Sequence, residues 1–206
     1  MKHRGSLIIN VEGNGKSYFL WNGTETYYKK LRLAYKDIQD DNINEYSYFS
    51  FFILCAATLE YSLNYVIADY CLNKYGPEKC KPYIDGYTSL NFKKKIHMTP
   101  SILSDGEFVF NEDKTAYKKL NELVSLRNKI MHGKEAINEF DFPNIKESKE
   151  EEIEFELKTK PNPIDRLDKT KCLEFGHALG DFKKYIMEPW FNHDLKENNL
   201  LIKNKN

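Results

Sequence analysis

The stretch YFSFFILCAATLEYSLNYVIADYCLNK, Tyr48 to Lys74, decides the fold because it is the longest apolar segment of the chain. Its apolar residues recur at helical spacing, which predicts one long helix. Gly76 and Pro77 end that helix, since glycine caps helix ends and proline cannot continue them. Glu60 lies near the middle of the stripe predicted to face the core, where a carboxylate needs a partner. The stripe consists of Phe52, Ala56, Leu59, Leu63, Ile67 and Tyr70.

Three further segments have the same helical periodicity, over residues 24–38, 113–132 and 165–187. The segment 113–132 begins near an aspartate and has Gly133 just past its end, as helix termini favour. Between the long helix and this one, NFKKKIHM predicts a short helix that stops before Pro100. The first and last of the three segments have apolar stripes made of Tyr27, Leu31, Tyr35 and Ile38, and of Cys172, Phe175, Leu179, Phe182 and Ile186.

The predicted strands are few. SLIINVEGNGKSYFLW alternates around Asn14-Gly15, which predicts a β-hairpin over 5–22. Its GNGKS is not a phosphate-binding loop, because that loop requires glycine at the position of Asn10 and must open a helix. KESKEEEIEFELKTK predicts a strand near 151–159 whose glutamates protect a sheet edge. We therefore expect a mainly α fold: a single domain over 1–206, an antiparallel helical bundle with a small β appendage and a disordered tail over 198–206.

The balance of charge limits the partners. Lys+Arg is 31 and Asp+Glu is 31, so the net charge is zero. An extended duplex track needs a basic excess, whereas a compact site for one or two phosphates does not. No metal or cofactor is expected, because the histidines and the four cysteines have no metal-site spacing. Cys55, Cys71 and Cys172 are expected to be buried thiols.

No membrane partner is expected. The apolar run at the N-terminus is too short for a signal peptide. Glu60 interrupts the long apolar stretch before it could span a bilayer. We expect a cytoplasmic protein.

The stretch SLRNKIMHG, residues 125–133, places a permanent cation on an apolar stripe. At about 100° per residue, Arg127 falls in the middle of that stripe, and Asn128 and His132 stack on its flank. A buried guanidinium is costly unless it is paired or lies at an interface. Either Arg127 pairs with Glu60 as a structural tie, or it serves a site. The stripe is formed by Leu120, Leu123, Val124, Ile130 and Met131.

Arg127-Asn128-x-x-x-His132, followed by glycine, resembles the R-N-x-x-x-H signature of the HEPN superfamily. The resemblance covers about residues 48–133 and implies a compact helical domain that dimerises. Many members are metal-independent ribonucleases of bacterial toxin–antitoxin, abortive-infection and CRISPR-associated systems. Carried over by position, Arg127 and His132 are the implied catalytic pair and Asn128 the polar residue that assists. Glu60 is not part of this motif. It is a candidate site residue only because helical spacing places it on the apolar stripe of its own helix.

The chemistry of the pair suits RNA cleavage by the 2′-hydroxyl. Histidine can act as base or acid near neutral pH, and arginine offers a fork that matches phosphate oxygens. The reaction needs two proton-transfer groups, so a homodimer that brings together two copies of His132 is expected, with the stripe as interface. Single-stranded or looped RNA is the expected substrate, and an antitoxin or defence-system protein is a possible partner. The alternative is a non-catalytic HEPN-like dimer that binds a protein or a nucleotide.

Overall fold

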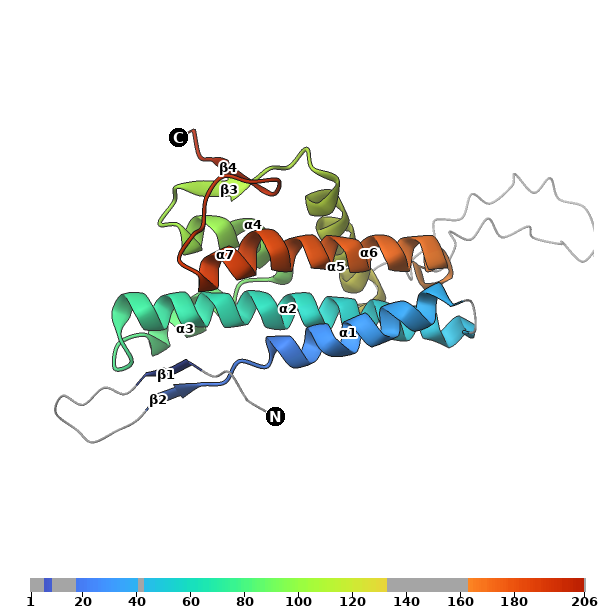
Figure 1. The fold of residues 1–206 in the computed structure, drawn as a ribbon, viewed down its shortest axis with the longest axis horizontal. Coiled ribbons are helices and arrows are strands. Elements are labelled where there is room, and N and C mark those ends of the chain that lie inside the picture. The colour runs from blue at the N-terminus through green and yellow to red at the C-terminus, as the bar shows by residue number, and fades with distance from the viewer. Residues whose placement is uncertain (1–5, 9–17, 41–42, 133–162, 206) are drawn as a thin grey trace, which may run out of the picture.

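A computed structural model of the chain describes residues 6–8, 18–40, 43–132 and 163–205. This part of the chain is mainly helical, as predicted (Figure 1). The helices are α1 (Thr24–Gln39), α2 (Glu45–Tyr75), α3 (Lys81–Thr88), α4 (Phe92–Leu103), α5 (Thr115–His132), α6 (Lys169–Phe182) and α7 (Glu188–Phe191). The strands are β1 (Ser6–Ile8), β2 (Tyr18–Leu20), β3 (Phe108–Phe110) and β4 (Leu201–Lys203).

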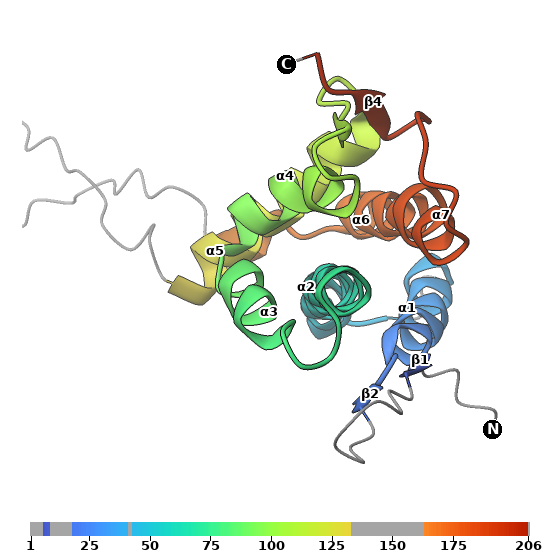
Figure 2. The same ribbon diagram turned by 90° about the vertical axis from the view of Figure 1, so that its left-hand side faces the viewer.

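Helix α2 is the axis of the fold, and Figure 2 shows it end-on with the other helices around it. It contacts α1, α3, α4, α5 and α6. Asn44 caps its start by accepting a hydrogen bond from the Ser47 N–H at 3.2 Å. Gly76 ends it with φ of 75°, a left-handed conformation that glycine adopts without strain. Every member of the predicted stripe, from Phe52 to Tyr70, is buried.

Helix α6 continues further than expected, through a π-helical turn (Lys183–Met187) into α7, and a 3₁₀ turn (Pro163–Arg166) precedes it. Its predicted stripe is fully buried, as is the thiol of Cys172. All four cysteines are buried and unbridged, which confirms the expectation that Cys55, Cys71 and Cys172 are buried thiols. Burial raises the pKa of the Cys172 thiol to about 12, so the thiol stays protonated at neutral pH.

Pro100 does not stop α4, contrary to the sequence-based prediction. The helix continues to Leu103, and Pro100 lies inside it. A proline removes one backbone hydrogen bond and costs about 3 kcal/mol within a helix. Ile102 and Leu103, beyond the proline, are both buried in the core. Burying two such side chains contributes about 1.5–3 kcal/mol each, which offsets the loss.

The prediction of a disordered tail over 198–206 is wrong for residues 198–205, which the structure describes. β4 pairs antiparallel with β3 in the register Phe108↔Lys203, and Asn111 N–H donates to Leu200 O at 2.8 Å. Leu200 and Leu201 are fully buried. The strand was missed because the chain ends in the polar sequence KNKN, and only the two leucines before it pack into the core. The β3–β4 ribbon lies against α4, whose end leads into β3.

The N-terminal strands pair as predicted. β1 and β2 are antiparallel, with Ser6 opposite Leu20. The Tyr61 hydroxyl on α2 accepts from Gly23 N–H at 3.0 Å, which ties the start of α1 to α2 just after the hairpin. The Asn14-Gly15 turn and the strand near 151–159 lie outside the described residues.

Helix α2 is long and apolar enough to cross a membrane by length and composition, although Glu60 was expected to prevent this. Of its most apolar segment, 67% is buried inside the protein. This burial accounts for the apolarity of α2, because the core helix of a globular domain has the same composition.

Candidate functional site

Arg127 lies at the boundary between the core and the surface of α5. Leu120, Leu123 and Val124 on its stripe are fully buried within one chain. The expectation that this stripe is an interface is therefore wrong for its first half, which packs against α2 and α6. The Arg127 side chain is 26% exposed, and Met131, one turn on, is 58% exposed. Only the last turn of the stripe remains open to a partner.

Three neighbours hold the guanidinium of Arg127. Its Nη2 lies 3.5 Å from Oε2 of Glu60 on α2, and its Nη1 donates to Oδ1 of Asn128 at 3.1 Å. Its Cζ lies 5.7 Å from the ring centre of Phe92 on α4. The structure thus brings Glu60, Arg127 and Asn128 together. Because each polar contact joins one atom to one atom, the contacts with described residues leave N–H groups of the five-donor guanidinium for another acceptor.

Lys95 is a member of this cluster that the sequence analysis missed. Lys95 is only 3% exposed, and its Nζ donates a hydrogen bond to Oδ1 of Asn64 at 2.7 Å. Burial lowers the pKa of Lys95, the charge of Glu60 raises it, and the charge of Arg127 lowers it. The helical spacing Phe92-x-x-Lys95-Ile96 marked Lys95 as the inward lysine of the KKK run.

The charges of the cluster favour an anion. Arg127 and Lys95 supply two positive charges and Glu60 supplies one negative charge, which leaves one positive charge. Asn64 and Asn128 add dipoles without charge. A phosphate at this place would meet a cation on a well-packed support, since Phe92 is buried beneath Arg127.

His132 is the last residue of α5, as predicted, and its side chain lies outside the described residues. Its position is four residues after Asn128, so the two positions share a face of the helix. The Asn128 amide oxygen accepts a hydrogen bond from Arg127. This contact was not predicted.

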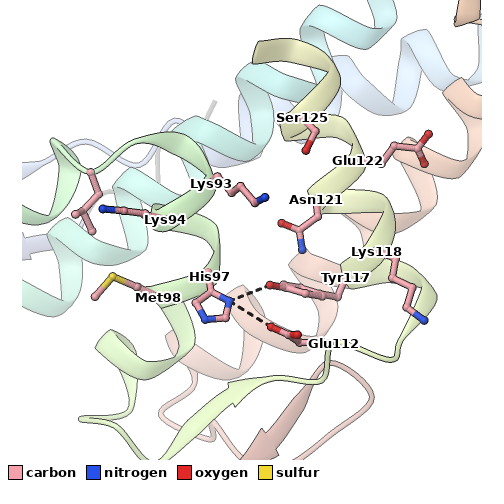
Figure 3. Close-up of a pocket in the computed structure, with 11 residues that line it drawn as sticks. Lys93, Lys94, His97, Met98, Glu112, Tyr117, Lys118, Asn121, Glu122 and Ser125 are labelled. Carbon is pink, nitrogen blue, oxygen red and sulfur yellow. Dashed lines mark hydrogen bonds and ion pairs between the residues drawn. The ribbon is translucent and has the colours of Figure 1, made fainter. Parts of the chain in front are cut away.

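A groove of about 850 Å³ lies between α4 and α5 and opens to solvent. Figure 3 shows Lys93 reaching from α4 toward Asn121 on α5. At the other end, Nδ1 of His97 lies 3.0 Å from the Tyr117 hydroxyl and 3.5 Å from Oε1 of Glu112. His97 is an exposed residue and forms one end of this groove.

Within the described residues, no group of three or more His, Cys, Asp or Glu side chains is arranged to hold a metal ion. No family model matches the chain, and no curated protein or solved structure is significantly similar to it.

Proposed function

We propose that this protein is a metal-independent endoribonuclease of HEPN type. The observation that carries the proposal is the support of Arg127: its guanidinium lies against Phe92, contacts Glu60 and Asn128, and remains 26% exposed. A structural arginine of the core would be covered, whereas a phosphate ligand must remain reachable. The helical bundle and the R-N-x-x-x-H spacing at the end of α5 agree with the resemblance.

In this proposal the 2′-oxygen of RNA attacks the adjacent phosphorus, and the bond from phosphorus to the 5′-oxygen breaks. His132 takes the proton of the 2′-hydroxyl, and His132 of the partner subunit donates a proton to the leaving 5′-oxygen. Arg127 binds the phosphorane oxygens, whose negative charge grows in the transition state. The products are a 2′,3′-cyclic phosphate and a 5′-hydroxyl, with no net consumption of protons.

The proposed homodimer forms through the last turn of α5, where Met131 is 58% exposed beside the cluster. An exposed methionine next to a cation suits a contact between two copies of one surface. Met131→Asp is then expected to convert a particle of twice 24.3 kDa into a monomer, measured by light scattering. Cleavage should be lost with the dimer, because a monomer holds one motif histidine.

The catalytic test compares the parent with Arg127→Ala and His132→Ala on a single-stranded RNA in buffer containing EDTA. We expect both variants to lose at least two orders of magnitude in kcat/KM, since each removes transition-state stabilisation or proton transfer. Arg32→Ala on α1 is the matched control, because Arg32 is exposed and remote from the cluster. Folded variants that cleave like the parent would refute the proposal.

The second candidate is a non-catalytic helical dimer that binds a protein or a nucleotide, and the contact between Arg127 and Glu60 favours it. An ion pair gives Arg127 a structural role that needs no RNA. No cleavage by the parent in EDTA, together with loss of the dimer on breaking the pair, would select this candidate. In either case we propose a cytoplasmic protein, because the apolar α2 is engaged in the core. The proposal of an antitoxin or defence-system partner rests on the resemblance to the HEPN superfamily.

A further inference from the structure

We propose that the groove between α4 and α5 binds the single strand of RNA that leads to the Arg127 cluster. This inference rests on the proposed function for the identity of the strand. The groove has the volume of a ligand site, about 850 Å³. It is distinct from the motif residues, none of which lines it.

The cationic side chains of the groove are available for phosphates. Lys93, Lys94 and Lys118 line it, and no carboxylate of the described residues lies within ion-pair distance of their ammonium groups. Both acids of the groove lie beside basic side chains. Glu112 lies beside His97, and Glu122 is paired with Lys119 on α5 and with Lys171 on α6. The groove therefore presents a local positive charge on a chain of zero net charge.

The walls of the groove suit a single strand rather than a duplex. Leu90 and Met98 supply apolar surface for unstacked bases, and Asn121 and Ser125 supply hydrogen-bonding groups for base edges. Tyr117 is buried and its hydroxyl contacts His97, so its ring is not a stacking platform. Binding should hence depend on phosphates more than on sequence.

The groove shares one face of α5 with Asn128 and His132, while Arg127 lies on the neighbouring apolar stripe and contacts Asn128. Asn121, Ser125, Asn128 and His132 follow one another at spacings of four, three and four, which keeps their positions within about 60° on the helix. Phe92, directly before Lys93, lies under Arg127. A strand that follows this face past Lys93 therefore arrives at the cluster.

The test measures binding of a 12-nucleotide 2′-O-methyl oligouridine, which lacks the attacking hydroxyl and cannot be cleaved. Fluorescence anisotropy compares the parent with the double variant Lys93→Gln/Lys94→Gln. The control is Lys29→Gln/Lys30→Gln on α1, which removes the same charge from the opposite side of α2 (Figure 2). All four lysines are exposed, so both variants should fold.

We expect the groove variant to bind roughly tenfold more weakly, since two phosphate contacts are lost. The slope of log K against log salt should fall by about 1.4, because each contact on a single strand contributes about 0.7. The α1 control should keep the parental affinity and slope. Equal affinity and slope for the parent and the groove variant would overturn the proposal, as would an equal loss in the control.

The two proposals fail separately. The uncleavable strand reports on the groove alone, and cleavage by Arg127→Ala reports on the catalytic cluster alone. On a dinucleotide, which is too short to occupy the groove, the groove variant should retain the parental kcat/KM. On a long strand it should raise KM and leave kcat unchanged, while a fall in kcat on both substrates would overturn the assignment of binding to the groove.

Discussion

Nη2 of Arg127 lies 3.5 Å from Oε2 of Glu60, across the contact between α5 and α2, and both side chains are partly exposed at 26% and 36%. A pair with this geometry is half-solvated, so it attracts weakly. The carboxylate orients the guanidinium without covering it. The same contact can therefore join α5 to α2 and also leave Arg127 accessible to a phosphate group.

The first prediction concerns the strength of this pair. A double-mutant cycle with Glu60→Gln and Arg127→Gln should give a coupling free energy of about 0.2–1 kcal/mol in urea unfolding, as for other partly exposed pairs. The pair Lys183–Glu25, 3.1 Å apart between the π-helical turn and α1, is a suitable reference. A coupling free energy of about 3 kcal/mol or more would instead indicate a buried ion pair, in which removal of one partner leaves the other charge buried and unpaired.

The second prediction concerns Lys95, whose pKa is lowered by burial. Glu60→Gln should lower the pKa of Lys95 further, because the carboxylate favours its charged form. Arg127→Gln should raise it, because the guanidinium disfavours that form. Titration of the lysine ¹³Cε resonances by NMR measures both shifts. If neither substitution changed the pKa of Lys95, its amine would not interact with Glu60 and Arg127 and would not belong to the cluster.

Much of the helical fold could be predicted, because apolar periodicity is strong in long helices. The stripes of α2 and α6 are buried residue for residue as their spacing indicated. Local rules failed where tertiary burial decided the outcome. Pro100 lies inside α4 because Ile102 and Leu103 beyond it are buried, and β4 forms because Leu201 is buried.

The candidate site was predictable in part. The helical wheel placed Glu60 and Arg127 on facing stripes, and the structure joins them. Lys95 and the groove residues were missed, because they depend on how α4 packs against α2 and α5. No single-helix pattern shows that the amine of Lys95 reaches Asn64, 31 residues earlier in the chain.

The third prediction concerns the C-terminal strand. Leu201→Ala should destabilise the protein by about 2–5 kcal/mol, because a fully buried leucine leaves a cavity when truncated. Lys203→Ala on the same strand should change stability by less than about 0.5 kcal/mol, since Lys203 is exposed. Chemical denaturation measures both. Equal, small effects would mean that β4 contributes nothing to the folded core.

The fourth prediction concerns two glycines of α6. A Cβ on Gly176 would lie 2.6 Å from Cδ2 of Tyr35, so Gly176→Ala must displace that ring and weaken the contact between α6 and α1. We expect a loss of about 1–3 kcal/mol, as for other overpacked sites. A Cβ on Gly180 would meet nothing within 4 Å, so Gly180→Ala should stabilise the helix by about 0.5–1 kcal/mol. Thermal unfolding should therefore shift in opposite directions for the two variants.

The fifth prediction concerns the charge network between α5 and α6. Lys119 Nζ lies 2.6 Å from Oε2 of Glu174, and Lys171 Nζ lies 2.8 Å from Oε1 of Glu122. Burial acts to raise the pKa of Glu122, but hydrogen bonds from Lys171 and Lys119 outweigh it, and the pKa falls below the ordinary 4.5. A carboxyl group with a lowered folded-state pKa binds its proton more weakly in the folded than in the unfolded protein.

The stabilisation from Glu122 is therefore complete above about pH 4.5 and is lost as the pH falls through the lowered pKa. Because the side chains are partly exposed, we expect Glu122→Gln to cost about 1 kcal/mol at pH 7, and progressively less below pH 4.5. Glu197→Gln, at an exposed position after α7, is the control and should give no such pH-dependent difference. Urea unfolding of the three proteins across this pH range measures the effect. A cost of Glu122→Gln that stays constant down to pH 3 would show that the carboxylate's charge is not what joins α5 to α6.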